Sequence, residues 1–274
     1  YAINSFYDNG IEECFEITTE LGNRIYGTGK HPLLCWNTNS HTLEFNSISS
    51  ITKDTYIVGK LNTNMFGSES IDDPYLVGIL AGDGSLTIKN LIGFASADNY
   101  LVEYFKTAFA GKNITEVKKE NHLELFVRDT NLYNKYVCDF GINCKSIDKN
   151  PSTKLRSLTR EDTIQVLQGL FDTDGCANKD GTVEYCSSSK NLAYFVFEQL
   201  LNLGILATIK EKRTSVNDTY IIRISSIYQV SKFLNTIGFR LSRKSSIIEQ
   251  YIKGNKGSNT KGLFPGLNYR VFEL

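Results

Sequence analysis

A nine-residue stretch that occurs twice constrains this chain more than any other feature. The first copy is Leu-Val-Gly-Ile-Leu-Ala-Gly-Asp-Gly at positions 76–84, and the second is Leu-Gln-Gly-Leu-Phe-Asp-Thr-Asp-Gly at positions 167–175. Each copy predicts an apolar helix that ends in an acid followed by glycine. Small residues stand four positions apart in both copies, at Gly78 and Gly82 and at Gly169 and Thr173. That spacing puts them on one helix face, where two helix backbones can approach closely, so the two copies are expected to pack together.

Such packing would bring Asp83 and Asp174 side by side at the C-terminal ends of the two helices. The negative end of a helix dipole repels a carboxylate by about 0.3–1 kcal/mol, and two adjacent carboxylates also repel each other. Each Asp could instead only bond turn donors before a glycine. Because the acid recurs at matching positions, a divalent cation held by both carboxylates is the better explanation.

Composition excludes some classes of protein and leaves others open. The 274 residues suffice for one large domain or two ordinary ones, and 41% of them are hydrophobic. We find no signal peptide and no apolar run long enough to span a membrane. The six cysteines have no CxxC spacing, so reduced thiols in the cytoplasm, or at the host-cell DNA, are expected. Thirty Lys and Arg balance 30 Asp and Glu, so a nucleic-acid-binding surface would need locally clustered cations.

The predicted elements after each copy follow the same order. The first half predicts strands at 86–89 and 92–96, a helix at about 99–109, strands at 116–119 and 123–128, and a helix at 131–139. The second half predicts a strand at 183–187, a helix at 192–203, strands at 208–211 and 220–224, and a helix ending at 237–239. Asp83 and Asp174 are 91 positions apart, which is the length of one repeat. The sequence therefore predicts an α+β fold, in which two αββαββα repeats are related by a pseudo-twofold axis through the paired helices.

Residues 1–67 predict short β-strands, at 14–18, 24–26 and 55–58, separated by turns rich in Gly and Asn. Thr28 and His31 lie three positions apart in a turn that follows the second of these strands. Such a turn can aim an imidazole at a neighbouring backbone amide, although an ordinary surface histidine has the same spacing.

Residues 74–252 resemble the LAGLIDADG homing endonuclease family in its single-chain, two-repeat form, since the two nine-residue stretches match the motif that names the family. The resemblance implies a hydrolase that makes a double-strand break with short 3′ overhangs at a long DNA site. It implies that Asp83 and Asp174, with carbonyl groups near Gly82 and Thr173, bind about two or three Mg²⁺ ions. It also places Lys149 and Lys244 near the scissile phosphates, with Lys145 and Arg243 as rivals.

In this family the two sheets form a saddle on double-stranded DNA, and alternate side chains of the strands face the bases. The candidate DNA contacts are Lys89, Lys118, Arg128, Lys179, Lys210, Lys212, Arg213 and Arg223. Each of them could equally contact a phosphate or be a simple surface charge.

Residues 9–36 resemble the intein (Hint) splicing domain, in which Thr28 and His31 would assist the first acyl shift. The chain starts at Tyr1 without the family's nucleophile and lacks its terminal His-Asn, so this polypeptide is not expected to splice. We expect a partial Hint domain at 1–67, an endonuclease domain at 68–256 with repeats at about 74–150 and 159–252, and a segment at 257–274 that returns toward the Hint-like domain. A LAGLIDADG insert within a splicing domain is a recurring arrangement.

A non-cleaving LAGLIDADG protein, either an RNA maturase or a regulator that binds DNA, is the main alternative. Loss of either terminal acid would favour it, whereas both Asp83 and Asp174 are present. The sequence therefore favours an endonuclease, expected to be a monomer without membrane association.

Overall fold

The structure is a computed structural model that describes residues 8, 10–142, 145–213 and 218–255. The chain divides into two compact units, one holding the described residues up to Lys60 and the other beginning at Leu61. Residues 61–67 join the second unit because the N–H groups of Asn62 and Gly67 donate to the carbonyls of Leu201 and Leu158, each at 3.0 Å. The predicted return segment at 257–274 lies outside the described residues.

The described part of the first unit consists of short antiparallel strands and one 3₁₀ turn. Strand β1 (Cys14–Thr18) pairs with β2 (Arg24–Thr28), and β3 (Pro32–Asn37) lies between β4 (Thr42–Ser47) and β5 (Tyr56–Ile57), with η1 (Ile48–Ser50) after β4. The predicted strands at 14–18 and 24–26 are confirmed, and the one at 55–58 is shorter than expected.

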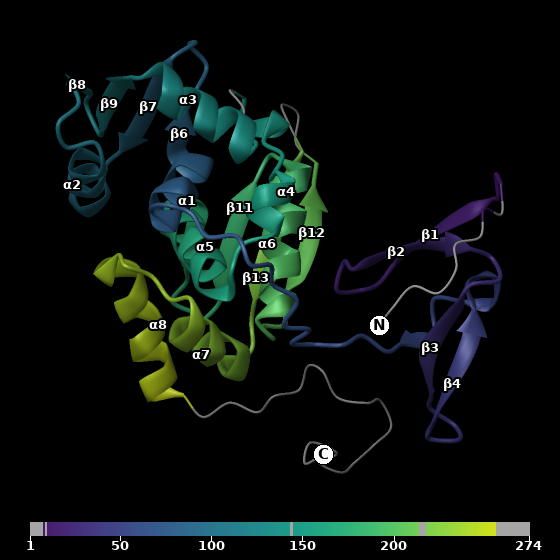
Figure 1. Cartoon of the computed structure of the whole chain (residues 1–274). Coiled ribbons are helices and arrows are strands. Elements are labelled where there is room, and N and C mark those ends of the chain that lie inside the picture. Colours follow the sequence, from purple (N-terminus) through teal and green to yellow (C-terminus); the bar gives the residue numbers. More distant parts are fainter. Residues whose placement is uncertain (1–7, 9, 143–144, 214–217, 256–274) are drawn as a thin grey trace. The chain divides into compact units, whose positions relative to one another are not determined.

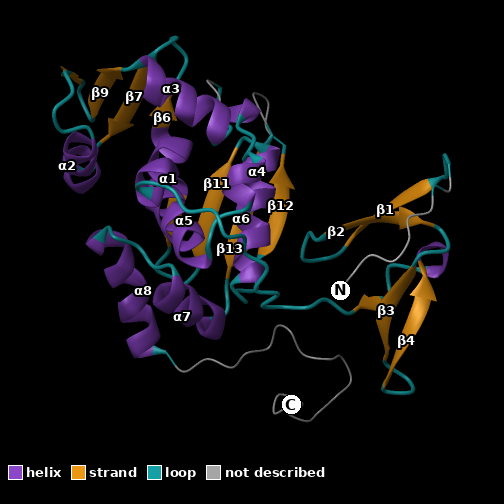
Figure 2. Cartoon of the chain, viewed as in Figure 1, coloured by secondary structure: helices purple, strands orange, loops and turns teal. Residues whose placement is uncertain are grey.

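The second unit contains the predicted duplication (Figure 2). The first repeat comprises α1 (Pro74–Asp83), β6 (Gly84–Ser85), β7 (Leu91–Ser96), α2 (Asn99–Ala108), β8 (Ile114–Lys118), β9 (Leu123–Arg128), α3 (Thr130–Asn134) and the π-helical turn η2 (Lys135–Asp139). The second comprises α5 (Arg160–Asp174), β10 (Gly175–Ala177), β11 (Val183–Ser187), α6 (Lys190–Asn202), β12 (Thr208–Lys212), β13 (Thr219–Ile224) and α7 (Ile227–Thr236). The sheet orders, β6-β7-β9-β8 and β10-β11-β13-β12, are the same.

Three shorter or later elements complete this unit. The repeats are joined by η3 (Ser146–Asp148) and α4 (Thr153–Arg156), and α8 (Ser242–Gly254) follows α7. The sequence patterns predict neither of these two helices. Helix α8 begins after Leu241, whose side chain offers no hydrogen bond to the helix, so the sequence carries no capping signal there.

The predicted strand at 86–89 is wrong. Strand β6 covers only Gly84–Ser85, and the chain then turns, with the Leu91 N–H donating to the Ile88 carbonyl at 3.1 Å and Asn90 at φ 63°. Leu86 is fully buried whereas Ile88 is 57% exposed, so the alternation that resembles a strand arises from one buried anchor in a turn.

Capping residues fix the starts of the two motif helices, as predicted. Asp73 accepts a hydrogen bond from the Leu76 N–H at 3.0 Å, and Pro74 occupies the first helical position of α1. In α5, the Thr159 hydroxyl accepts from the Asp162 N–H at 3.3 Å.

The central contact of the second unit is between α1 and α5, which lie side by side with a sheet on either side of the pair (Figure 1). A Cβ atom on Gly78 would lie 2.3 Å from the carbonyl oxygen of Val166, and one on Gly169 would lie 2.6 Å from that of Tyr75. The helices therefore touch backbone to backbone, and only glycine fits at these positions. This confirms that the small residues of the two motifs face each other.

We predict that Gly169→Ala lowers the free energy of unfolding by about 1–3 kcal/mol, because the new methyl group must push the two helix backbones apart. Gly254→Ala is the matched control, since a Cβ there meets nothing within 4 Å and alanine favours a helix by about 0.5–1 kcal/mol. Urea unfolding measures both. Equal effects of the two substitutions would contradict the close packing.

Candidate active site

The two acids lie together, as predicted. Asp83 and Asp174 are the last residues of α1 and α5, and each helix stops where the next glycine becomes extended. A Cβ on Gly82 would lie 3.2 Å from Oδ2 of Asp174. Asp83 opens to solvent, and Asp174 is half-buried.

The surroundings of the pair disfavour two negative charges. The pKa of Asp174 is raised to about 7, first by desolvation and then by the charge of Asp83, while Lys149 and Lys244 act in the opposite direction. Desolvation by the surrounding protein also raises the pKa of Asp83. The two lysines therefore do not fully compensate the carboxylates, and an added cation would relieve the remaining repulsion.

Each motif helix ends against a buried lysine. Lys149 Nζ donates to the carbonyls of Ala81 and Gly82, both at 2.6 Å, at the end of α1. Lys244 Nζ donates to the carbonyls of Asp172 and Gly175, both at 2.6 Å, at the end of α5. The last carbonyls of a helix lack partners within the helix, and its dipole favours a cation there.

Burial makes these lysines unusual. Lys149 is 7% exposed and Lys244 is 5% exposed, and desolvation lowers the pKa of both. The structure thus brings both predicted lysines to the acids. The rivals lie elsewhere, because Lys145 is exposed before η3 and Arg243 Nε donates to Asp98 at 2.9 Å.

The carbonyls that we predicted as metal ligands already have a donor. Gly82 O accepts from Lys149 at 2.6 Å, and Thr173 O lies 3.4 Å from Lys244 Nζ. A carbonyl oxygen has two lone pairs, so a lysine contact leaves one for a cation. Their role as ligands stays a prediction.

The donor set fits a hard cation that keeps other oxygen ligands. Within the part of the chain that the structure describes, no group of three or more His, Cys, Asp or Glu could hold a metal ion. Asp83 and Asp174 offer carboxylate oxygens only. Mg²⁺ is commonly bound by one or two carboxylates plus water and substrate phosphate, so this pair suits it.

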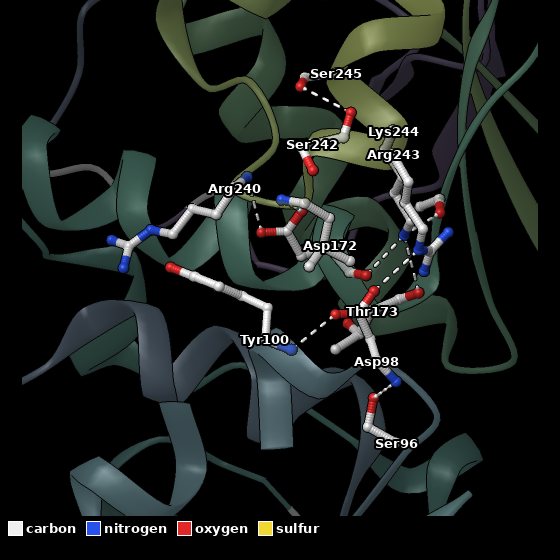
Figure 3. A network of polar contacts seen from close by, with 12 residues as sticks. Ser96, Asp98, Tyr100, Asp172, Thr173, Arg240, Ser242, Arg243, Lys244 and Ser245 are labelled. Carbon is white, nitrogen blue, oxygen red and sulfur yellow. Dashed lines mark hydrogen bonds and ion pairs between the residues drawn. The ribbon is translucent and has the colours of Figure 1, made fainter. Parts of the chain in front are cut away.

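Sequence reasoning missed a buried network around Asp172 (Figure 3). This carboxyl accepts from the Tyr75 hydroxyl at 2.7 Å and from the N–H groups of Arg240 at 3.0 Å and Leu241 at 3.3 Å. The Arg240 guanidinium lies 3.8 Å from the Tyr75 ring centroid. Asp172 takes the place of Ala81 in the other motif copy, and this difference between the copies is the signal that could have revealed the network.

A pocket of about 380 Å³ opens beside Asp83. Asp98, Asp172, Thr173 and Arg243 line it, with His122 from the turn between β8 and β9. The acid thus faces a space between the first repeat and the start of α8.

The open face of the second sheet carries several predicted DNA contacts. Lys210 and Lys212 alternate with buried Ile209 and pair with Ile221 and Thr219 of β13, so both face away from the core. Arg223 shares this face, but it pairs with Asp180 at 3.2 Å and Glu184 at 3.5 Å. This arginine is therefore already engaged by acids of its own sheet.

The first sheet carries fewer cations on the matching face. Arg128 ends β9 on the face opposite buried Val127, and it is exposed. Lys118 pairs with Leu123, which packs against the core, so its side chain lies on the helix-covered face. The placement of Lys118 follows from strand register, which the sequence alone did not reveal.

The remaining candidates lie in turns or near strand ends. Lys89 and Lys179 are exposed in the turns after β6 and β10. Arg213 is 86% exposed and pairs with Glu211 at 3.4 Å. In the first unit, the His31 N–H donates to the Thr28 carbonyl at 3.0 Å and closes the predicted turn.

Comparison with known families defines the class of this site. Residues 161–238 match the model of the LAGLIDADG-like domain, so the second repeat carries such a domain. The homing endonuclease I-DmoI, in a set of mesophilic variants, aligns with 61% of this chain and 94% of its own at 21% identity and a TM-score of 0.48.

Among curated proteins, the small subunit of replication factor C from Thermococcus kodakarensis is 24% identical over 279 aligned residues, covering 99% of this chain and 31% of that protein. The large (alpha) polypeptide of the ribonucleoside-diphosphate reductase NrdEB from Bacillus subtilis is 25% identical, covering 72% of this chain and 20% of that protein. A DNA gyrase polypeptide from Mycobacterium leprae is 25% identical, covering 90% and 20%. The chain thus spans a third or less of each relative. Among the described residues, we find no helix long and apolar enough to span a membrane.

We predict that Asp174→Asn stabilises the metal-free protein at pH 8 and not at pH 4. The pKa of Asp174 rises from 3.8 to about 7 on folding, so the folded state binds more protons between these values, and stability falls as pH rises through this window. Melting temperatures in a chelator, measured across this range, test the prediction. Asp180→Asn is the control with the opposite sign, because hydrogen bonds from Thr182 lower the pKa of Asp180.

We predict that Tyr75→Phe lowers the free energy of unfolding by about 1–3 kcal/mol, because the buried Asp172 carboxyl loses a donor. Tyr133→Phe is the control, since its hydroxyl donates to the Leu86 carbonyl at 3.3 Å and is only part-buried. Denaturant unfolding would contradict the role of Asp172 if the two substitutions cost the same.

Proposed function

We propose that this protein is a site-specific endonuclease that makes a double-strand break in DNA by Mg²⁺-dependent phosphodiester hydrolysis, and that it derives from an intein. The observation that carries the proposal is the pair of acids at the ends of two helices in backbone contact, with the pKa of Asp174 raised to about 7 by desolvation and by Asp83. Two acids held together against their repulsion indicate a site built for a cation.

In this proposal, Asp83 and Asp174 hold Mg²⁺, which when bound supplies charge neutralisation on the phosphate and activation of the attacking water. Lys149 and Lys244 provide fixed positive charge beside the acids. Because they are buried and bonded to helix carbonyls, they need no rearrangement to stabilise charge that develops during the reaction. Their lowered pKa also brings them closer to proton transfer at neutral pH.

The two sheets would bind the DNA. Strand β6 follows Asp83 directly and β10 follows Asp174 directly, so a duplex across the sheets passes the acids. Lys210 and Lys212 would contact the duplex from the second sheet, and Arg128 from the first. Lys118, on the helix-covered face, could reach only the phosphate backbone at the edge. The other candidates would contact phosphates, the last two of them after leaving their acidic partners: Lys89, Lys179, Arg213 and Arg223.

The relatives support an intein origin. Similarity to parts of a replication factor, a reductase and a gyrase, each over a third or less of the polypeptide, suits a segment inserted into unrelated proteins. The similarity to the replication factor C polypeptide covers 99% of this chain and so includes the strand-rich first unit. We assign that unit to a partial Hint domain, with Thr28 and His31 as remnants of its splicing site.

The test is cleavage of a supercoiled plasmid that carries the coding sequences flanking this segment in its gene, joined without the segment. With Mg²⁺ the parent protein is expected to linearise the plasmid. Asp83→Asn and Asp174→Asn should each slow cutting about 100-fold or more, because several kcal/mol of charge stabilisation is lost. Asp180→Asn, at a surface turn, should cut like the parent.

Two results would change the conclusion. If both active-site variants cut as fast as the parent, the acids do not hold the metal. If the parent binds the plasmid but leaves it intact, the protein belongs with the non-cleaving LAGLIDADG proteins, as a maturase or regulator.

A further inference from the structure

The segment that carries Lys149 is held from the other repeat. Ser189 caps α6, where its hydroxyl oxygen accepts from the Leu192 N–H at 3.1 Å. The same hydroxyl donates its hydrogen to the carbonyl of Lys149, and Ser189 is fully buried. A hydroxyl has one hydrogen to donate, so this cap directs its only donor to the lysine backbone.

Lys149 lies where the chain has little regular structure. It follows the short 3₁₀ turn η3 and precedes Asn150, whose N–H donates to the Gly141 carbonyl at 3.1 Å. From this position its ammonium reaches the end of α1, with 2.6 Å to the carbonyls of Ala81 and Gly82. A backbone without helix or strand bonds depends on single ties of this kind to fix a side chain.

The equivalent cap of the first repeat reaches in the opposite direction. Asp98 stands 91 positions before Ser189, and each has its N–H bonded to a serine hydroxyl two residues earlier, at 3.1 Å. Asp98 accepts from Arg243, the neighbour of Lys244, at 2.9 Å (Figure 3). The Arg243 side chain is 63% exposed, where an ion pair contributes little, so the buried Ser189 bond is the stronger of the two ties.

We propose that Ser189 is a positioning residue for Lys149, so that the lysine at the end of α1 depends on a side chain of the second repeat. Its consequence for cutting rests on the proposed nuclease function. Without the hydroxyl, the Lys149 carbonyl is released and the ammonium loses its fixed place at the helix end. One DNA strand would then be cut more slowly than the other.

Acetylation by a trace of acetic anhydride, read by mass spectrometry, tests the positioning without DNA. Ser189→Ala is expected to raise labelling of Lys149 about fivefold and to leave Lys244 unchanged, as expected for one lost hydrogen bond. Ser189→Thr keeps a hydroxyl and should restore the parent value. Ser226→Ala is the matched control, because Ser226 caps α7 by accepting from the Gln229 N–H at 3.2 Å and should leave Lys149 unchanged.

Cleavage of the plasmid described above, with each strand labelled, gives the second readout. Ser189→Ala should slow about fivefold the same strand that Lys149→Met slows, and nicked plasmid should accumulate. Unchanged Lys149 labelling, or equal labelling gains at Lys149 and Lys244, would overturn the proposal, as would equal slowing of both strands. A parent protein that never cuts would overturn the nuclease function alone, since the labelling still decides the positioning.

Discussion

The backbone contact between α1 and α5 determines the positions of the other elements in the second unit. Because Gly78 and Gly169 have no side chains to separate the helices, the two axes approach as closely as peptide groups allow. Both helices end at the same level, so their terminal acids meet, and each sheet begins one residue later. A change at the helix contact would therefore move the acids and both sheets together, and the close packing serves the site as much as the core.

Charge balance at the helix ends is incomplete, and this imbalance is informative. Lys149 and Lys244 each satisfy helix carbonyls and also lie close enough to the acids to lower the pKa of Asp174. That pKa nevertheless stays raised, because desolvation and the neighbouring Asp83 outweigh the two lysines. A lysine that only neutralised a carboxylate would form an ion pair with it, whereas these ammonium groups bond to backbone carbonyls and leave the carboxylate oxygens available.

Much of this arrangement could be predicted from the sequence because it depends on local patterns. The motif pair, the four-residue spacing of small side chains and the caps at Asp73 and Thr159 predict both helices and their contact. Features set by long-range pairing could not be predicted in the same way. The face of Lys118 follows from strand register, α8 begins without a capping side chain, and Asp172 finds its donor on the other motif helix. Alternation at 86–89 suggested a strand because a turn with one buried leucine gives the same pattern.

The Asp172–Tyr75 hydrogen bond joins the two motif helices, and only in one direction. The position that matches Tyr75 in α5 is Val166, and the position that matches Asp172 in α1 is Ala81. A symmetric dimer of second repeats would bury two carboxyls without a phenol to donate to them, and a dimer of first repeats would bury two phenols without an acceptor. The halves have thus lost the interchangeability that a duplication begins with, so a hybrid enzyme assembled from halves of different origin must inherit both members of this pair.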